Sequence, residues 1–259
     1  MRERNERATI FDDADVAHFY AHRPPYAPAL YEFLLGLVPR RRVLVDLGCG
    51  PGKIAAALAD DFEQVLAIDP AGAMIGEARA LYGVSKTNIA WRHARAEDTA
   101  LPDAIDLITA GTAIHWMAHE ILFPKLAERT NLVAIVTGDA PINPLWQDAW
   151  RATMTAWLNR LHGIAYDETA FAADGQRYEP WLDIAGRRDF TFAYRQSVED
   201  FIACQHSRAS WSRTLMGETL SAEFDRDLAA LLRPFAKDGQ LTLNLTSTLV
   251  WGAPRLSAA

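Results

Sequence analysis

The chain has few cysteines and no long apolar run, and these absences exclude several classes of protein. Its 259 residues include two cysteines, Cys49 and Cys204, and no His or Cys group has the spacing of a metal site. We therefore expect free thiols and no bound metal. No apolar stretch approaches the roughly 18 residues that cross a bilayer, and residues 1–7 lack the apolar core of a signal peptide. A cytoplasmic protein without membrane insertion is expected.

An excess of positive charge is also missing. Lys and Arg number 26 against 33 Asp and Glu, which gives a formal net charge of −7, and no basic run is visible. Nucleic-acid binding depends on neutralising phosphates with Lys and Arg, so this balance argues against DNA or RNA. A small-molecule substrate is the expected partner, and the sequence does not indicate an oligomeric state.

A glycine-rich turn between a strand and a helix is the strongest feature that the sequence does contain. Residues 43–45 form the short apolar run of a buried strand, and residues 54–59 are typical of a helix start. Between them stand Gly48, Gly50 and Gly52. Glycines permit positive φ and remove the Cβ atoms that would hold a ligand away from the main chain. The turn therefore predicts close contact with a ligand.

The spacing of the turn excludes two common nucleotide motifs. A dinucleotide fingerprint, G-x-G-x-x-G, would need a third glycine where Lys53 stands, and no Gly-Lys-Ser/Thr closes the turn as in a P-loop. The pattern present is instead Asp46-x-Gly48-x-Gly50-x-Gly52. A nicotinamide-dependent oxidoreductase is accordingly a weak alternative.

A second predicted strand, at residues 64–69, ends in a carboxylate. Asp69 follows the glycine turn by about twenty residues, which is where a doubly wound sheet places the acid that accepts hydrogen bonds from ribose hydroxyls. The ligand is therefore expected to contain a ribose.

The rest of the chain continues the alternation of strands and helices and then departs from it. Further strands are predicted at 88–93, 105–110, 131–138, 188–194 and 241–251. Helices are predicted at 11–22, 29–38, 121–129, 145–161, 198–207 and 222–235, with another that ends near residue 81. The pattern indicates one α/β domain.

In combination, the Asp46 turn and the acid at residue 69 resemble the class I S-adenosylmethionine-dependent methyltransferases. The chain is similar to the small-molecule branch, of the ubiquinone/menaquinone and trans-aconitate methyltransferase types. The resemblance implies a Rossmann-like, seven-stranded, mostly parallel sheet with one antiparallel strand and helices on both faces. It also implies one domain with four parts: an N-terminal helical cap (1–39), a cofactor-binding core (40–138), a helical lid insertion (139–187) and terminal strands and helices (188–259).

The resemblance further implies S-adenosyl-L-methionine as cofactor and S-adenosyl-L-homocysteine as product. The residues that it assigns to the cofactor are Tyr20, Arg23, Asp46, Gly48, Gly50, Asp69, Pro70, Met74, Ala96, Glu97 and Ala110. In this assignment Glu97, or else Asp98, contacts the adenine edge, and Arg23 pairs with the methionine carboxylate. Without the resemblance, Met74 and Tyr20 would be core residues, and Arg23 and Glu97 solvated charges.

The acceptor side is indicated by the segment after the fourth strand and by an aromatic-rich region. His115 could act as a base or substrate anchor, although a structural role is the commoner one for a lone histidine. Aromatic residues in the lid region suit a flat substrate, and a packed helix core is the alternative. The candidates for substrate contact are Trp116, Trp146, Ser210, Trp211 and Ser212.

These observations predict methyl transfer to a small-molecule acceptor by in-line displacement at the sulfonium methyl group. An oxygen or carboxylate acceptor is favoured over carbon or nitrogen. The alternative is a protein that binds the cofactor without methylating, either as a regulatory partner or as a cyclase that uses the sulfonium charge.

Overall fold

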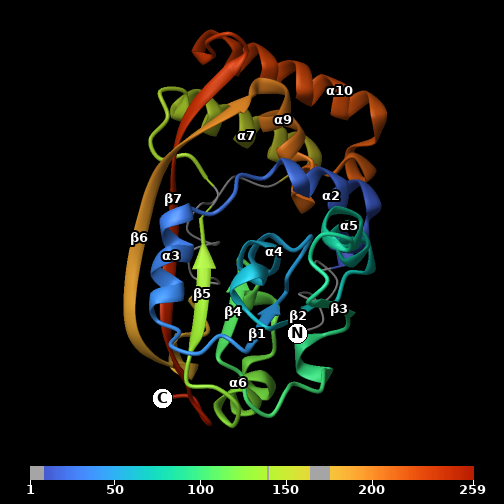
Figure 1. Cartoon of the computed structure of the whole chain (residues 1–259). Coiled ribbons are helices and arrows are strands. Elements are labelled where there is room, and N and C mark those ends of the chain that lie inside the picture. The colour runs from blue at the N-terminus through green and yellow to red at the C-terminus, as the bar shows by residue number, and fades with distance from the viewer. Residues whose placement is uncertain (1–8, 139, 164–175) are drawn as a thin grey trace.

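The computed structural model describes residues 9–138, 140–163 and 176–259, and its centre is a seven-stranded sheet (Figure 1). The strand order is β3-β2-β1-β4-β5-β7-β6. Strands β1 to β5 are parallel, and β7 runs antiparallel to both β5 and β6. The sheet therefore has one reversed strand, as predicted. The strands are β1 (Val43–Leu47), β2 (Gln64–Asp69), β3 (Ile89–His93), β4 (Leu107–Gly111), β5 (Val133–Thr137), β6 (Leu182–Ser197) and β7 (Gln240–Pro254).

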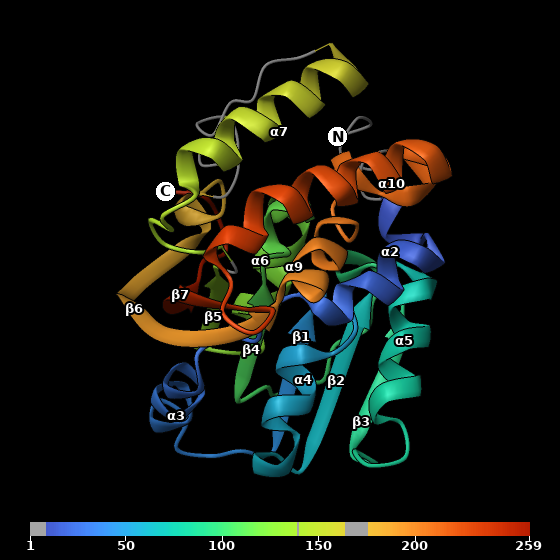
Figure 2. The same ribbon diagram turned by 90° about the horizontal axis from the view of Figure 1, so that it is seen from above.

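Helices cover both faces of this sheet, which confirms the expected architecture (Figure 2). One face packs against α3, α4 and α5, and the other packs against α6. The described α-helices are α2 (Ala14–Phe19), α3 (Pro28–Gly36), α4 (Lys53–Leu58), α5 (Gly72–Tyr82), α6 (His119–Ala127), α7 (Gln147–His162), α9 (Val198–Gln205) and α10 (Arg213–Leu232).

Alternation along β1 explains how one strand serves both faces. Successive side chains of a strand point to opposite sides, so Leu44 joins the core under α4 while Val45 and Leu47 join the core under α6. All three are fully buried. A strand enclosed on both faces has a continuous apolar sequence, and this is why the short run before the glycine turn predicted β1 correctly.

A separate helical layer lies beyond the carboxyl ends of the parallel strands. It consists of α7, α9 and α10, which share an apolar core with the adjacent part of β7 (Figure 1). The predicted lid helix at 145–161 corresponds to α7, but α9 and α10, from the C-terminal part of the chain, complete the same layer. Long-range packing, rather than one insertion, therefore builds this layer.

Two helix predictions need correction. The helix predicted at 11–22 is interrupted, because Asp13 caps α2 by accepting hydrogen bonds from the backbone of Asp15 and Val16, and 3-10 turns flank the helix. The helix predicted at 222–235 begins earlier, at Arg213, where the Ser212 side chain caps it. Gly217 (φ 70°) kinks α10. A glycine with a left-handed backbone is untypical of a helix interior, which is why the helix was predicted only after this residue.

None of the helices in the described ranges is both long and apolar enough to cross a membrane. Within the same ranges, no group of three or more His, Cys, Asp or Glu side chains could hold a metal ion. Cys49 and Cys204 are both buried and form no disulfide.

Candidate functional site

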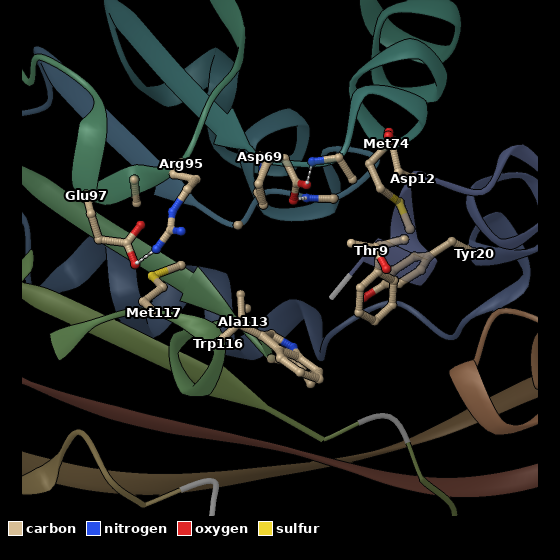
Figure 3. A pocket seen from close by; sticks show the side chains of 18 residues that line it. Thr9, Asp12, Tyr20, Asp69, Met74, Arg95, Glu97, Ala113, Trp116 and Met117 are labelled. Carbon is tan, nitrogen blue, oxygen red and sulfur yellow. Dashed lines mark hydrogen bonds and ion pairs between the residues drawn. The ribbon is translucent and has the colours of Figure 1, made fainter. Parts of the chain in front are cut away.

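A cavity of about 440 Å³ opens at the carboxyl ends of β1, β2 and β4, the edge where open parallel sheets bind ligands (Figure 3). It is closed on its other side by the N-terminal segment that includes α2. Nine residues assigned to the site from the sequence line it: Tyr20, Gly48, Gly50, Asp69, Pro70, Met74, Ala96, Glu97 and Trp116. The fold thus collects most of the cofactor candidates around one space.

The glycine turn forms the floor of the cavity, and two of its glycines are required for different reasons. Gly48 (φ 62°) lies so close to Ala113 that a Cβ atom would meet that residue's Cβ at 2.4 Å. Gly50 (φ 53°) faces open space, and in the described part of the chain, apart from its two neighbours in sequence, no atom lies within 4 Å of the position that a Cβ would occupy. Gly48 therefore permits packing against the segment after β4, whereas Gly50 keeps the cavity clear for a ligand.

Asp69 joins the glycine turn to the end of β2. Its Oδ2 accepts a hydrogen bond from the backbone N–H of Gly50 at 2.8 Å, and its Oδ1 accepts one from Ala71 N at 2.8 Å. Burial raises the pKa of this carboxyl group above its ordinary value, although both hydrogen bonds oppose the shift. Each carboxylate oxygen has a further lone pair, so Asp69 can also accept bonds from two ligand hydroxyls.

Glu97 stands at the opposite end of the cavity from Tyr20 (Figure 3). Its side chain is buried, its Oε1 accepts a hydrogen bond from Ala118 N at 2.7 Å, and Arg95 Nη2 lies 3.4 Å from the same oxygen. The Lys125 ammonium donates to the Glu97 backbone carbonyl. The alternative that Glu97 is a solvated cap is therefore wrong. It is a held carboxylate beside the cavity and can accept from a ligand amine.

Asp46, a cofactor candidate, does not line the cavity. It is 1% exposed, and its Oδ1 accepts from the Thr109 hydroxyl at 2.8 Å while its Oδ2 accepts from Ala55 N at 3.1 Å. These bonds tie β1 to β4 and to the first turn of α4. Asp46 therefore supports the glycine turn from behind, and it is not among the residues that line the cavity, contrary to what direct contact with the cofactor would require.

Burial raises the pKa of Asp46 from 3.8 to about 7. The folded state therefore holds this proton more tightly than the unfolded state does. The stabilisation that results is complete below about pH 4 and is lost as pH rises towards 7. The free energy of unfolding falls by at most about 1.4 kcal/mol per pH unit because of this group. Asp46→Asn keeps an acceptor for Ala55 N and an N–H donor for Thr109. We expect its free energy of unfolding to vary less between pH 5 and 7 than that of the wild type, as measured by urea denaturation.

Asp189→Asn is the matched control, since Asp189 also accepts from a threonine hydroxyl, Thr248 Oγ1 at 2.7 Å, but is exposed on β6. This variant should keep the pH dependence of the wild type. Parallel pH profiles for Asp46→Asn and wild type would contradict the assignment.

Arg23 lies outside the cavity as well. Its Nε donates to Ser207 Oγ at 2.8 Å, its Nη2 donates to the Ser207 carbonyl at 3.0 Å, and its guanidinium group lies 4.1 Å from the centre of the Tyr20 ring. The guanidinium group of this half-buried residue is thus held by hydrogen bonds and is not part of the cavity lining. It joins the cap to the turn that follows α9 and supports Tyr20, which lines the cavity.

The segment after β4 contributes different residues from those expected. Ala110 is buried in the sheet core, and the lining comes instead from Gly111, Thr112 and Ala113. Trp116 lines the cavity, but His115 does not, and the two ring centres are 4.9 Å apart. Thr112 has φ 51°, which is unusual for a β-branched residue, and its hydroxyl lies 3.1 Å from the Tyr26 hydroxyl.

None of the other four substrate candidates lines the cavity. Trp146 packs edge-on against Trp150 and Phe201, and Trp211 stacks on Phe224 with ring centres 5.2 Å apart. Ser212 caps α10, and the carbonyl of Ser210 lies 3.4 Å from His162 Nε2. Trp146 and Trp211 belong to the apolar core of the layer of α7, α9 and α10, so the alternative of a packed helix core is the correct one for the lid residue Trp146.

Sequence reasoning missed several lining residues. Arg95, Ala71 and Met117 adjoin predicted residues, and proximity to the motifs could have identified them. Thr9, Phe11 and Asp12 come from the start of the described chain and carry no motif. Asp12 Oδ1 accepts from Ala73 N at 3.1 Å, so this segment is fixed to the beginning of α5. Only the folding of the cap over the sheet brings these residues to the site.

Comparison with known proteins agrees with this geometry. Residues 44–133 match a family described as a methyltransferase domain. The trans-aconitate 2-methyltransferase of Escherichia coli K12 is 32% identical over 147 residues, 54% of each chain. The malonyl-[acyl-carrier protein] O-methyltransferase of Legionella pneumophila is 32% identical over 129 residues, 48% of this chain and 42% of that one. The chain spans about half the length of the curated relatives it matches.

A solved structure from Anaeromyxobacter dehalogenans, provisionally named a type II methyltransferase, has the same fold over nearly the whole chain. The TM-score is 0.67 at 24% identity, and the match covers 92% of this chain and 99% of the other. The likeness extends beyond residues 44–133 and therefore includes the terminal strands and the helical layer.

Proposed function

We propose that the chain is a class I S-adenosylmethionine-dependent methyltransferase and that it transfers the methyl group of S-adenosyl-L-methionine to a small-molecule acceptor. The strongest support is the contact between Asp69 and the glycine turn. The carboxylate at the end of β2 is bonded directly to the glycine turn at Gly50, and both line the same cavity. A ribose-binding acid and a surface for close backbone approach therefore stand side by side.

The residues present fit this cofactor. Asp69 has acceptor capacity for the two ribose hydroxyls, and Glu97 is a buried acceptor for the exocyclic amine of adenine. Gly50 leaves room for the ligand beside the main chain. The lining includes three acidic side chains, Asp12, Asp69 and Glu97, which suits a ligand that carries a positively charged sulfur.

When bound, the cofactor supplies a methyl group that is already electrophilic because its sulfur is cationic. The chain then has to hold the acceptor in line with the carbon–sulfur bond and to exclude water. Positioning of this kind can contribute on the order of 7 to 11 kcal/mol. We assign this task to the N-terminal segment with Phe11 and Tyr20 and to Trp116, which enclose the cavity opposite the glycine turn.

We further propose an oxygen acceptor, either a hydroxyl or a carboxylate. The support is that two relatives are named for trans-aconitate and for O-methylation of a malonyl group. An acceptor that is already ionised needs no general base. A role for His115 remains a proposal, and its ring, which lies 4.9 Å from the Trp116 ring and is not part of the cavity lining, favours orientation of Trp116 over direct proton transfer.

Incubation with S-adenosylmethionine labelled in its methyl group and a metabolite extract tests the function. We expect label in the small-molecule fraction, dependent on the protein and abolished by Asp69→Ala. His115→Ala should reduce the transfer less than Trp116→Ala, since only Trp116 lines the cavity. If the protein binds S-adenosylhomocysteine but transfers no label to any acceptor, the non-methylating alternative, a regulatory protein or cyclase, replaces the proposal.

A further inference from the structure

The part of the cavity farthest from Glu97 has an apolar, aromatic wall. Phe11, from the N-terminal segment, and Trp116, from the turn after β4, pack edge to face with ring centres 6.0 Å apart. Tyr20 also lines the cavity. Figure 3 shows the Trp116 and Tyr20 rings on the side of the cavity away from Arg95 and Glu97. Flat aromatic surfaces of this kind bind flat, apolar ligands well.

The charges of the cavity lining disfavour acceptors that carry several carboxylates. Among the described residues that line the cavity, Arg95 is the one cation, and it lies 3.4 Å from Glu97 and 3.7 Å from Asp98. The carboxylates of Asp12, Asp69 and Glu97 line the same space. Because the proposed function gives Asp69 and Glu97 to the cofactor, the acid left to face an acceptor is Asp12, and the lining cation Arg95 already pairs with Glu97 and Asp98. An acceptor with two or three carboxylates would therefore meet a like charge without matching cations, which opposes binding.

Arg23, which the resemblance pairs with a carboxylate, adds no positive charge to the cavity lining. Arg23 donates to the hydroxyl and the carbonyl oxygen of Ser207 and lies outside the lining. Asp12 is held in place by its bond to Ala73 N, so the negative charge beside the aromatic wall is a fixed feature of the site.

We propose that the acceptor is a molecule with a flat apolar body and a single oxygen nucleophile, and that polycarboxylates are excluded. This inference rests on the proposed function and narrows it. It separates this chain from the relative named for trans-aconitate, because the aromatic wall selects the body of the acceptor, and Asp12, which has no matching cation in the lining, rejects additional carboxylates.

The test is a calorimetric comparison of three probes on protein saturated with S-adenosylhomocysteine: 2-naphthol, trans-cinnamate and trans-aconitate. We expect 2-naphthol and cinnamate to bind about ten-fold or more tightly than trans-aconitate. Trp116→Ala should weaken 2-naphthol binding by about ten-fold or more. Trp181→Ala, at a tryptophan outside the cavity lining, should leave it unchanged. Asp12→Asn should strengthen trans-aconitate binding by removing one like charge.

Trans-aconitate binding as tight as 2-naphthol binding overturns the inference, and so does the absence of binding by both aromatic probes. Naphthol affinity that is the same in Trp116→Ala and wild type, with both proteins folded by circular dichroism, also overturns it. The preceding titration with S-adenosylhomocysteine is read separately. Failure at that step counts against the proposed function, whereas normal cofactor binding with the wrong probe order counts only against the acceptor class.

Discussion

Asp69→Ala is expected to weaken binding of S-adenosylhomocysteine by about 100-fold or more, measured by calorimetric titration. Removing the carboxylate would leave two ribose hydroxyls without their acceptor, and each hydrogen bond to a charged group is worth about 1.5 to 3 kcal/mol. The same change frees Gly50 N and Ala71 N, which Asp69 now holds at 2.8 Å. The glycine turn would therefore lose its order as well as its ligand contact.

Asp106→Ala provides a matched control. Asp106 Oδ2 also accepts two backbone hydrogen bonds, from Arg42 N at 2.9 Å and Val43 N at 3.0 Å, but it precedes β4 and thus stands at the opposite edge of the sheet. We expect this variant to lose stability and to keep its cofactor affinity. Equal affinities for Asp69→Ala and wild type would contradict the ribose assignment and, with it, the proposed function.

Gly50→Ala is expected to weaken S-adenosylhomocysteine binding by about 10- to 100-fold, because the added methyl group enters the space reserved for the ligand at a cost of about 1 to 3 kcal/mol. Among the described residues, and apart from the two chain neighbours of Gly50, no atom lies within 4 Å of that methyl position, so the packing that the structure describes is undisturbed. The left-handed backbone (φ 53°) adds a stability cost of about 1 to 2 kcal/mol.

Gly239→Ala separates these two effects. Gly239 also has a left-handed backbone (φ 73°) and open space at its Cβ position, but it lies in the turn before β7 and does not line the cavity. Both variants should lose similar stability in thermal unfolding, and only Gly50→Ala should lose affinity. Wild-type affinity in Gly50→Ala would show that the ligand does not approach this part of the turn.

The elements around the motifs could be predicted because their signals are local. The apolar run of β1 reflects a strand buried on both faces, and Asp69 ends β2 as the spacing predicted. Helix boundaries were less accurate where a side chain overrode periodicity. Asp13 and Ser212 both cap helices at positions that sequence patterns did not identify as helix starts.

Residue roles were harder to predict than residue positions. Asp46 belongs to the glycine-turn pattern, yet its carboxylate bonds to Thr109 and Ala55 inside the fold. Trp211 looked suitable for a substrate but stacks on Phe224 in the helical layer. A sequence pattern shows that an acid or a ring is needed near a site. It does not show whether that side chain points towards the ligand or behind it.

The sequence by itself determined the doubly wound core, the glycine turn and the acid that closes β2, since each depends on residues close together in the chain. Only the tertiary structure decided which side chains complete the cavity. Phe11 and Trp116 are far apart in the chain and meet because the N-terminal segment folds over the carboxyl ends of the strands, fixed there by Asp12 and Arg23. Contacts of this kind depend on long-range packing, which leaves no periodic or spaced pattern in the sequence.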